Sequence, residues 1–262
     1  VSINIDTGTA AAPADAPGLG AFMFALMDKG TKQYDANELA AEKDKIAMAS
    51  GFRNGLERSS LGYRILTPYL AESLEIAADM MRNPVFPEDE LEKIKAQLAA
   101  YLSNIAINPG GAARSLFERA IYGEDNPMGG VWTPELAEQV NRDKLRKFHA
   151  AEITPDQMTV YMIGDVDLDT AKEAVENAFG GWNAKNQSAL DGIGSALAPT
   201  PRVILIHHPE AVQSTILAGH AIAPFDATAN TELSIMNAVF GGSFESRINM
   251  NLREDKSWSY GM

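Results

Sequence analysis

Residues 17–31 read PGLGAFMFALMDKGT. This stretch predicts a short apolar helix from Gly18 to Met27, ended by Gly30 in the manner of a glycine cap. Upstream, Val1–Asp6 alternates apolar and polar residues, which is typical of a β-strand, and a Pro-rich loop of small residues joins the two. The chain is therefore expected to open with a strand, a loop and an apolar helix.

The remaining sequence continues this mixture of helices and strands. Strands are predicted at 52–58 and 61–66, joined at Ser59-Ser60, and a buried strand is predicted at 158–164. Residues 186–201 are rich in Gly, Ser, Ala and Pro and lack periodicity, which predicts an interdomain linker. After it, the pattern restarts with strands at 202–207 and 214–222 and helices at 229–240 and 244–254. We therefore predict a first subdomain at 1–190, a linker at 191–201, and the opening part of a second subdomain at 202–262.

Composition excludes several functional classes. The formal net charge is −13 and the sequence has no cluster of Lys and Arg, so we expect no nucleic-acid partner. No apolar run approaches the ~20 residues of a membrane-spanning helix. Cysteine is absent, which excludes disulfides and cysteine catalysis. The chain begins within a predicted strand and has no signal-like segment, so we expect it to be part of a longer protein. The compartment stays open between the bacterial periplasm and the cytoplasm.

Residues 17–31 also resemble a known motif. In the pitrilysin/insulinase family of zinc peptidases, the inverzincins, the same frame carries H-x-x-E-H on a helix, with Gly-Leu before it and Lys-Gly-Thr after it. Both flanks are present here. Ala21 stands at the position of the first histidine, Phe24 at that of the general-base glutamate, and Ala25 at that of the second histidine. We expect these residues to turn that face of the helix into core.

The other metal ligands that the resemblance implies are missing as well. The family's third ligand, a glutamate, falls by spacing at Ala100 or Tyr101. A catalytic zinc needs three His, Asp, Glu or Cys ligands and an open water position. The chain's four histidines are His149, His207, His208 and His220. Adjacent residues of a strand point to opposite faces, so His207 and His208 are expected to lie where a strand meets a loop. His149 is expected to be packed or at the surface, and His220 to lie in the core. No cofactor is therefore expected in this chain, and zinc is expected only in a partner half.

The strongest part of the resemblance lies near the end of the chain. Residues 240–248 read FGGSFESRI, and residues 251–261 read NLREDKSWSYG. They are similar to the family's second subdomain, whose Arg and Tyr reach over the substrate, and the matching residues here are Arg253 and Tyr260. Peptide hydrolysis builds negative charge on the attacked carbonyl oxygen, and a guanidinium and a phenol are both donors at neutral pH. We expect the helix to end near Asp255 and Tyr260 to fold back from a following strand.

The resemblance implies a fold and a function. The fold is α/β (α+β), with two similar subdomains, each an antiparallel-rich sheet with helices on one side, and the second incomplete. The function is that of the inactive half of a zinc peptidase, working on a peptide substrate with a catalytic half that carries H-x-x-E-H. The alternative is a purely structural or assembly protein of the same fold. A glycine-rich-loop subunit of mitochondrial processing peptidase is disfavoured, because the Gly241–Phe244 segment is short.

Overall fold

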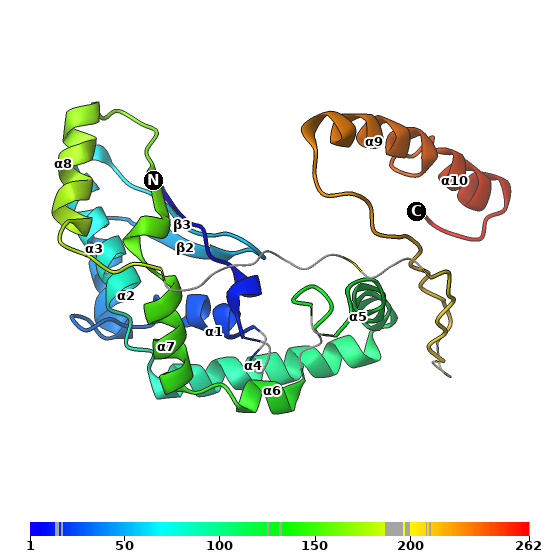
Figure 1. Cartoon of the computed structure of the whole chain (residues 1–262), viewed down its shortest axis with the longest axis horizontal. Helices are drawn as coiled ribbons and strands as arrows, with labels where there is room; N and C mark the ends of the chain where they lie inside the picture. The colour runs from blue at the N-terminus through cyan, green and yellow to red at the C-terminus, as the bar shows by residue number, and fades with distance from the viewer. Residues whose placement is uncertain are drawn as a thin grey trace. The chain divides into compact units, whose positions relative to one another are not determined.

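The computed structural model describes residues 1–13, 16, 18–124, 126–130, 133–186, 196, 200–207, 209 and 211–261 (Figure 1). Its strands are β1 (Ser2–Ile5), β2 (Ala49–Asn54), β3 (Ser59–Arg64) and β4 (Met158–Tyr161). Its α-helices are α1 (Leu19–Leu26), α2 (Ala36–Lys45), α3 (Leu70–Arg82), α4 (Glu88–Ile107), α5 (Pro109–Tyr122), α6 (Pro134–Glu138), α7 (Arg142–Glu152), α8 (Leu168–Phe179), α9 (Ala227–Phe240) and α10 (Arg247–Asn249). The described residues also form short 3₁₀ turns, η1 (Thr9–Ala11), η2 (Thr67–Tyr69) and η3 (Pro155–Gln157), and a π-helical turn, η4 (Met250–Asp255).

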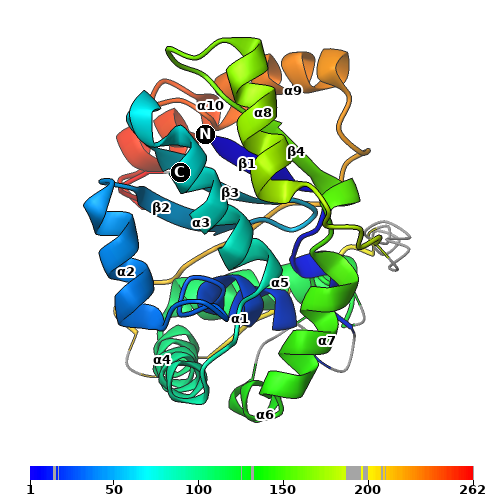
Figure 2. The ribbon, with the colours of Figure 1, turned by 90° about the vertical axis from the view of Figure 1, so that its left-hand side faces the viewer.

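The four strands form one antiparallel sheet in the order β2-β3-β1-β4. Its two faces differ in burial. Ile3, Ile5, Leu61 and Tyr63 alternate along β1 and β3 and are buried at 0–5% exposure, while their neighbours in sequence are more exposed. Helices α3 and α8 cross one face of the sheet (Figure 2). The predicted mixed α/β class, with an antiparallel sheet and helices on one side, is confirmed.

The predicted boundaries of the first hairpin are wrong. Ser59 and Ser60 belong to β3, and the turn lies four residues earlier, where the Gly55 amide donates to the Arg58 carbonyl at 2.9 Å. This turn brings Asn54 opposite Ser59 and Phe52 opposite Leu61. The register buries Leu61 on the helix side, and a shift of one residue would have turned it outward.

The strand predicted as buried at 158–164 is shorter and lies at the sheet edge. β4 pairs only with β1 among the described strands, and Tyr161 is 54% exposed. An apolar run of this length fits a buried strand or a half-exposed edge strand equally well, because its neighbours decide which faces are covered.

The chain divides into two compact units, Val1–Gly219 and His220–Met262. The predicted linker at 191–201 lies largely outside the described residues, so the predicted domain boundaries stay a prediction. None of the described residues in 202–207 and 211–222 belongs to a strand, so both predicted strands are wrong. Val203 and Leu205 are 97% and 88% exposed. A strand needs a neighbour to satisfy its backbone groups, and the described part of the chain offers none here.

The second unit contains α9, α10 and η4. The helix predicted at 244–254 begins three residues late, at Arg247, and its second half is π-helical. Ser246 starts it, accepting at 3.4 Å from the Asn249 amide. The end predicted near Asp255 is confirmed.

Candidate functional site

Helix α1 carries Ala21, Phe24 and Ala25, the residues that the sequence resemblance aligns with the family's zinc motif. Gly18 precedes it with φ 75°, a left-handed conformation that glycine adopts without strain. The helix buries Leu19, Phe22, Met23 and Leu26 at 0–2% exposure. Ala21 and Ala25 are four residues apart and share the opposite, exposed side. The expectation that both alanines join the core is therefore wrong, because the helix turns this side away from the packed layer.

Phe24 behaves differently from the two alanines. Its side chain is 3% exposed, and its ring lies 5.9 Å from that of Phe52 on β2, tilted by 46°. This placement confirms the expected core role for Phe24 alone. The three motif positions thus split into two exposed methyl groups and one aromatic ring that fills the space beside the sheet.

The position expected for the third ligand has no donor facing α1. Ala100 and Tyr101 lie on the exposed side of α4, and Tyr101 is 61% exposed. The packed side of α4 carries Leu91, Lys95 and Leu98, and the Lys95 ammonium donates to Glu92 at 2.9 Å. Within the described ranges, no three His, Cys, Asp or Glu side chains come together as a metal-binding group.

Among the histidines that the structure describes, His149 alone is buried. It is 9% exposed on α7, its Nε2 donates to the Met81 carbonyl at 2.8 Å, and its ring meets the Phe86 ring edge-on at 5.7 Å. Burial lowers the pKa of His149, and the bond to Met81 opposes that shift only in part. His149 is therefore a neutral residue that is packed in the core. Of the two placements that the sequence left open, packed or at the surface, the packed one is confirmed.

The remaining histidines lie away from the core. His207 is exposed, and His208 falls outside the described residues. His220 is also exposed, with Nδ1 donating to the Ala221 carbonyl at 2.7 Å, so its predicted core placement is wrong. The cause is that the predicted strand around it is not part of a sheet.

Arg253 lies in η4 and packs on an aromatic ring. Its guanidinium carbon lies 4.5 Å from the centroid of the Phe244 ring, and its Nε lies 3.4 Å from Glu254 Oε1. Its side chain is 39% exposed, so the charge remains accessible to a ligand.

Tyr260 follows a chain reversal after η4. Ser257 has φ 56°, its amide donates to the Arg253 carbonyl at 3.1 Å, and the Trp258 amide donates to the Leu252 carbonyl at 2.9 Å. The expected fold-back is therefore present, but residues 256–261 contain no strand. Tyr260 is 91% exposed, and no interaction between described residues joins it to Arg253. Arg253 and Tyr260 therefore lie on one short segment, but in the described structure their side chains do not form a joint site.

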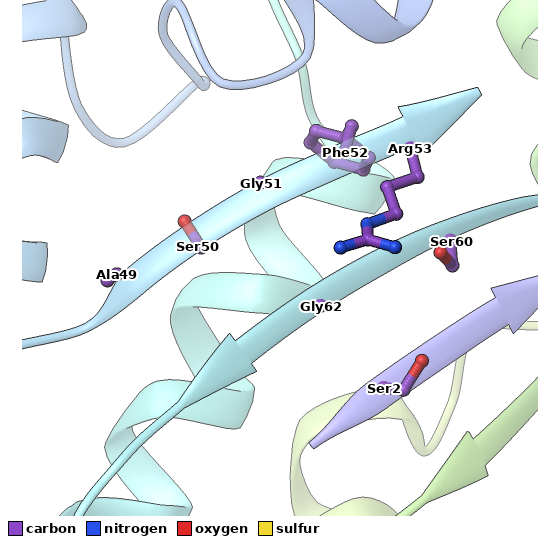
Figure 3. Close-up of a pocket in the computed structure, with 8 residues that line it drawn as sticks. All are labelled: Ser2, Ala49, Ser50, Gly51, Phe52, Arg53, Ser60 and Gly62. Atoms are coloured by element: carbon purple, nitrogen blue, oxygen red, sulfur yellow. The ribbon is translucent and has the colours of Figure 1, made fainter.

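The exposed face of the sheet in the first unit is hollowed. A hollow of about 520 Å³ lies over β1, β2 and β3 and is lined mainly by small and polar residues (Figure 3). The lining residues are Ser2, Ala49, Ser50, Gly51, Phe52, Arg53, Ser60 and Gly62. Arg53 extends from β2 over β3. The hollow is open, so it suits an extended polar ligand better than a compact apolar one.

Two family models match this chain, one in each half of the sequence. Residues 1–122 match the model described as insulinase, peptidase family M16, and residues 139–262 match the model described as peptidase M16 inactive domain. The first match covers β1, β2, β3 and α1, and the second covers β4 and η4, with Arg253 and Tyr260. The chain belongs to the insulinase family of peptidases, family M16.

Individual relatives agree with this assignment. An uncharacterized zinc protease of Bacillus subtilis, YmxG, is 26% identical over 263 residues, which cover 99% of this chain and 63% of that protein. An uncharacterized zinc protease of Rickettsia bellii is 24% identical over 93% of this chain and 58% of that protein. The chain thus spans about three-fifths of the length of these curated relatives.

A solved structure shows the same fold. The peptidase M16 inactive domain from Pseudomonas fluorescens superposes with a TM-score of 0.81 at 19% identity, over 99% of this chain and 63% of that one. The described part of this M16 chain holds no helix that is both long enough and apolar enough to cross a membrane.

Sequence reasoning missed two residues near Arg253. Phe244 contacts the Arg253 guanidinium, Asn249 donates to the Phe244 carbonyl, and neither was singled out by residue type. The available signal was the spacing: an aromatic nine residues before a motif arginine, with a polar residue between them.

Proposed function

We propose that this chain is the non-catalytic half of an M16 zinc peptidase, and that it supplies Arg253 and Tyr260 to a catalytic half that carries H-x-x-E-H. The proposal rests on two features that occur together in this chain. The zinc-motif positions hold Ala21, Phe24 and Ala25, which cannot ligate a metal, while the accessible donors Arg253 and Tyr260 are kept.

The chemistry fits a division of labour between two halves. Zinc in the catalytic half would activate the water and take part of the charge that develops on the attacked carbonyl oxygen. A guanidinium and a phenol from this chain would hold the peptide backbone and the rest of that charge by donating hydrogen bonds. Neither donor needs to change its protonation state.

The hollow on the exposed sheet face supports a substrate-facing role for the first unit. Its lining of serine, glycine and alanine, with Arg53 above it, leaves room for an extended chain against the sheet. β2 is an edge strand that pairs only with β3 among the described strands, and a peptide can add to such an edge by main-chain hydrogen bonds. The proposed substrate is accordingly an extended peptide enclosed between the two halves.

The test is substitution of the two donors in the full-length protein combined with its catalytic half. Arg253→Ala and Tyr260→Phe should each lower turnover by about a hundredfold or more, the effect of removing one oxyanion donor. Arg253→Lys should rescue poorly, because lysine lacks the planar fork. Affinity between the halves and the melting temperature should not change.

The same experiment decides between this proposal and the structural alternative. Wild-type turnover in both variants, with normal assembly, would favour a purely structural or assembly protein. Glu245→Gln provides a matched control, since it removes a charge near the segment from a side chain with no assigned role.

A further inference from the structure

Phe244 has no packing reason to be aromatic. Its side chain is 58% exposed, and it belongs to neither of the hydrophobic core clusters of the described residues. What its ring contacts is the Arg253 guanidinium, at 4.5 Å from the ring centroid. A cation over an aromatic face within about 6 Å is attracted by the ring quadrupole.

The backbone that carries Phe244 is fixed from both sides. The Asn249 side chain donates to the Phe244 carbonyl at 2.6 Å, and Asn249 is 3% exposed. On the other side, the Ser243 hydroxyl donates to the Ala238 carbonyl of α9 at 2.8 Å. The ring is therefore attached to a short loop that α9 and α10 hold in place.

Arg253 needs such a support. An arginine side chain has many rotamers to lose, and a donor that must meet a developing charge acts best when it is oriented beforehand. The neighbouring Glu254, at 3.4 Å from Nε, makes only a long contact with the guanidinium. The Phe244 ring restricts the guanidinium without using its donors, which stay available for a substrate carbonyl.

We infer that Phe244 is a positioning residue for Arg253, which it holds by a cation–π contact in the orientation used on substrate. The inference rests on the proposed function, since it assumes that Arg253 acts on substrate. In this role Phe244 acts through Arg253 and not on the substrate itself.

The kinetic test uses the full-length protein with its catalytic half. Phe244→Leu should lower kcat by about two- to thirtyfold, the range of a cation–π contact from an exposed to a desolvated site, with little change in KM. Phe244→Tyr should retain wild-type kcat, because tyrosine keeps the aromatic face. Phe240→Leu on α9 is the matched control: Phe240 is 55% exposed, it has no cation contact among the described residues, and the substitution should change nothing.

The double variant separates positioning from general structural damage. In an Arg253→Ala background, Phe244→Leu should cause no further loss of kcat. A second loss of the same size there would overturn the inference, as would full activity of Phe244→Leu in the wild-type background.

A spectroscopic measurement on the chain alone keeps the inference separate from the proposed function. With nitrogen-15-labelled arginine, the side-chain resonance of Arg253 should be shifted upfield by the ring, lose that shift in Phe244→Leu, and keep it in Phe244→Tyr. An Arg253 resonance that does not move in Phe244→Leu would overturn the positioning role. Wild-type turnover of Arg253→Ala would instead refute the proposed function.

Discussion

Truncating Phe24 to alanine tests whether the residue that we align with the family's general base is part of the core. Phe24 is 3% exposed and packs against Phe52, so Phe24→Ala removes a fully buried ring. Burial of that kind is worth about 3–5 kcal/mol of unfolding free energy, including the cavity that remains. Up to about 1.5 kcal/mol of it comes from the aromatic pair. We therefore expect a loss of about 4 kcal/mol.

Urea unfolding followed by far-ultraviolet circular dichroism measures this loss. With a slope of about 2 kcal/mol per molar urea, the midpoint of the first unit should fall by about 2 M. Ala25→Gln is the control, because Ala25 lies on the exposed side of the same helix and should shift stability by no more than about 0.5 kcal/mol.

A double-mutant cycle adds a sharper criterion. Combining Phe24→Ala with Phe52→Ala should show a coupling of about 0.5–1.5 kcal/mol, since the two rings are direct neighbours. Equal effects of Phe24→Ala and Ala25→Gln, or no coupling in the cycle, would refute the packing argument. Because the ring is buried, a charged side chain at position 24 would be placed in the core at a large cost.

Three further outcomes are expected. Ala21→His combined with Ala25→His should fold normally, because both side chains are exposed, yet elemental analysis should find no stoichiometric zinc, since two histidines leave the third ligand unsupplied. The folded-state pKa of His149 lies below its ordinary value of 6.5, so the stability that depends on its neutral form is present above that pH and is lost as the pH falls. His149→Gln should therefore flatten the decline of the melting temperature between pH 7 and pH 5, and an unchanged decline would contradict this assignment. Limited proteolysis should cut first within 191–201 and leave a fragment of about 190 residues, a size set by the predicted boundary; first cleavage near Gly219 would instead favour the boundary between the two compact units.

The sequence by itself determined the features that depend on neighbouring residues. Helix starts are of this kind: Asp35 caps α2 by accepting from the Asn37 and Glu38 amides at 2.8 Å, and Asn108 caps α5. These signals work because a helix satisfies its hydrogen bonds within one segment. The family could also be recognised from the sequence, because the resemblance rests on short local patterns: the residues around Ala21–Ala25 and the spacing of Arg253 and Tyr260.

Only the tertiary structure decided which side chains those elements bury. Ala21 and Phe24 are three residues apart on one apolar helix, yet one is exposed and the other is core, because the sheet covers only part of the helix surface. β4 became an edge strand, and residues 202–207 did not become a strand at all, for a related reason. A strand forms its hydrogen bonds with other segments and is buried by them. Whether a segment becomes a strand, and whether that strand is central or at an edge, therefore depends on partners that no local pattern encodes.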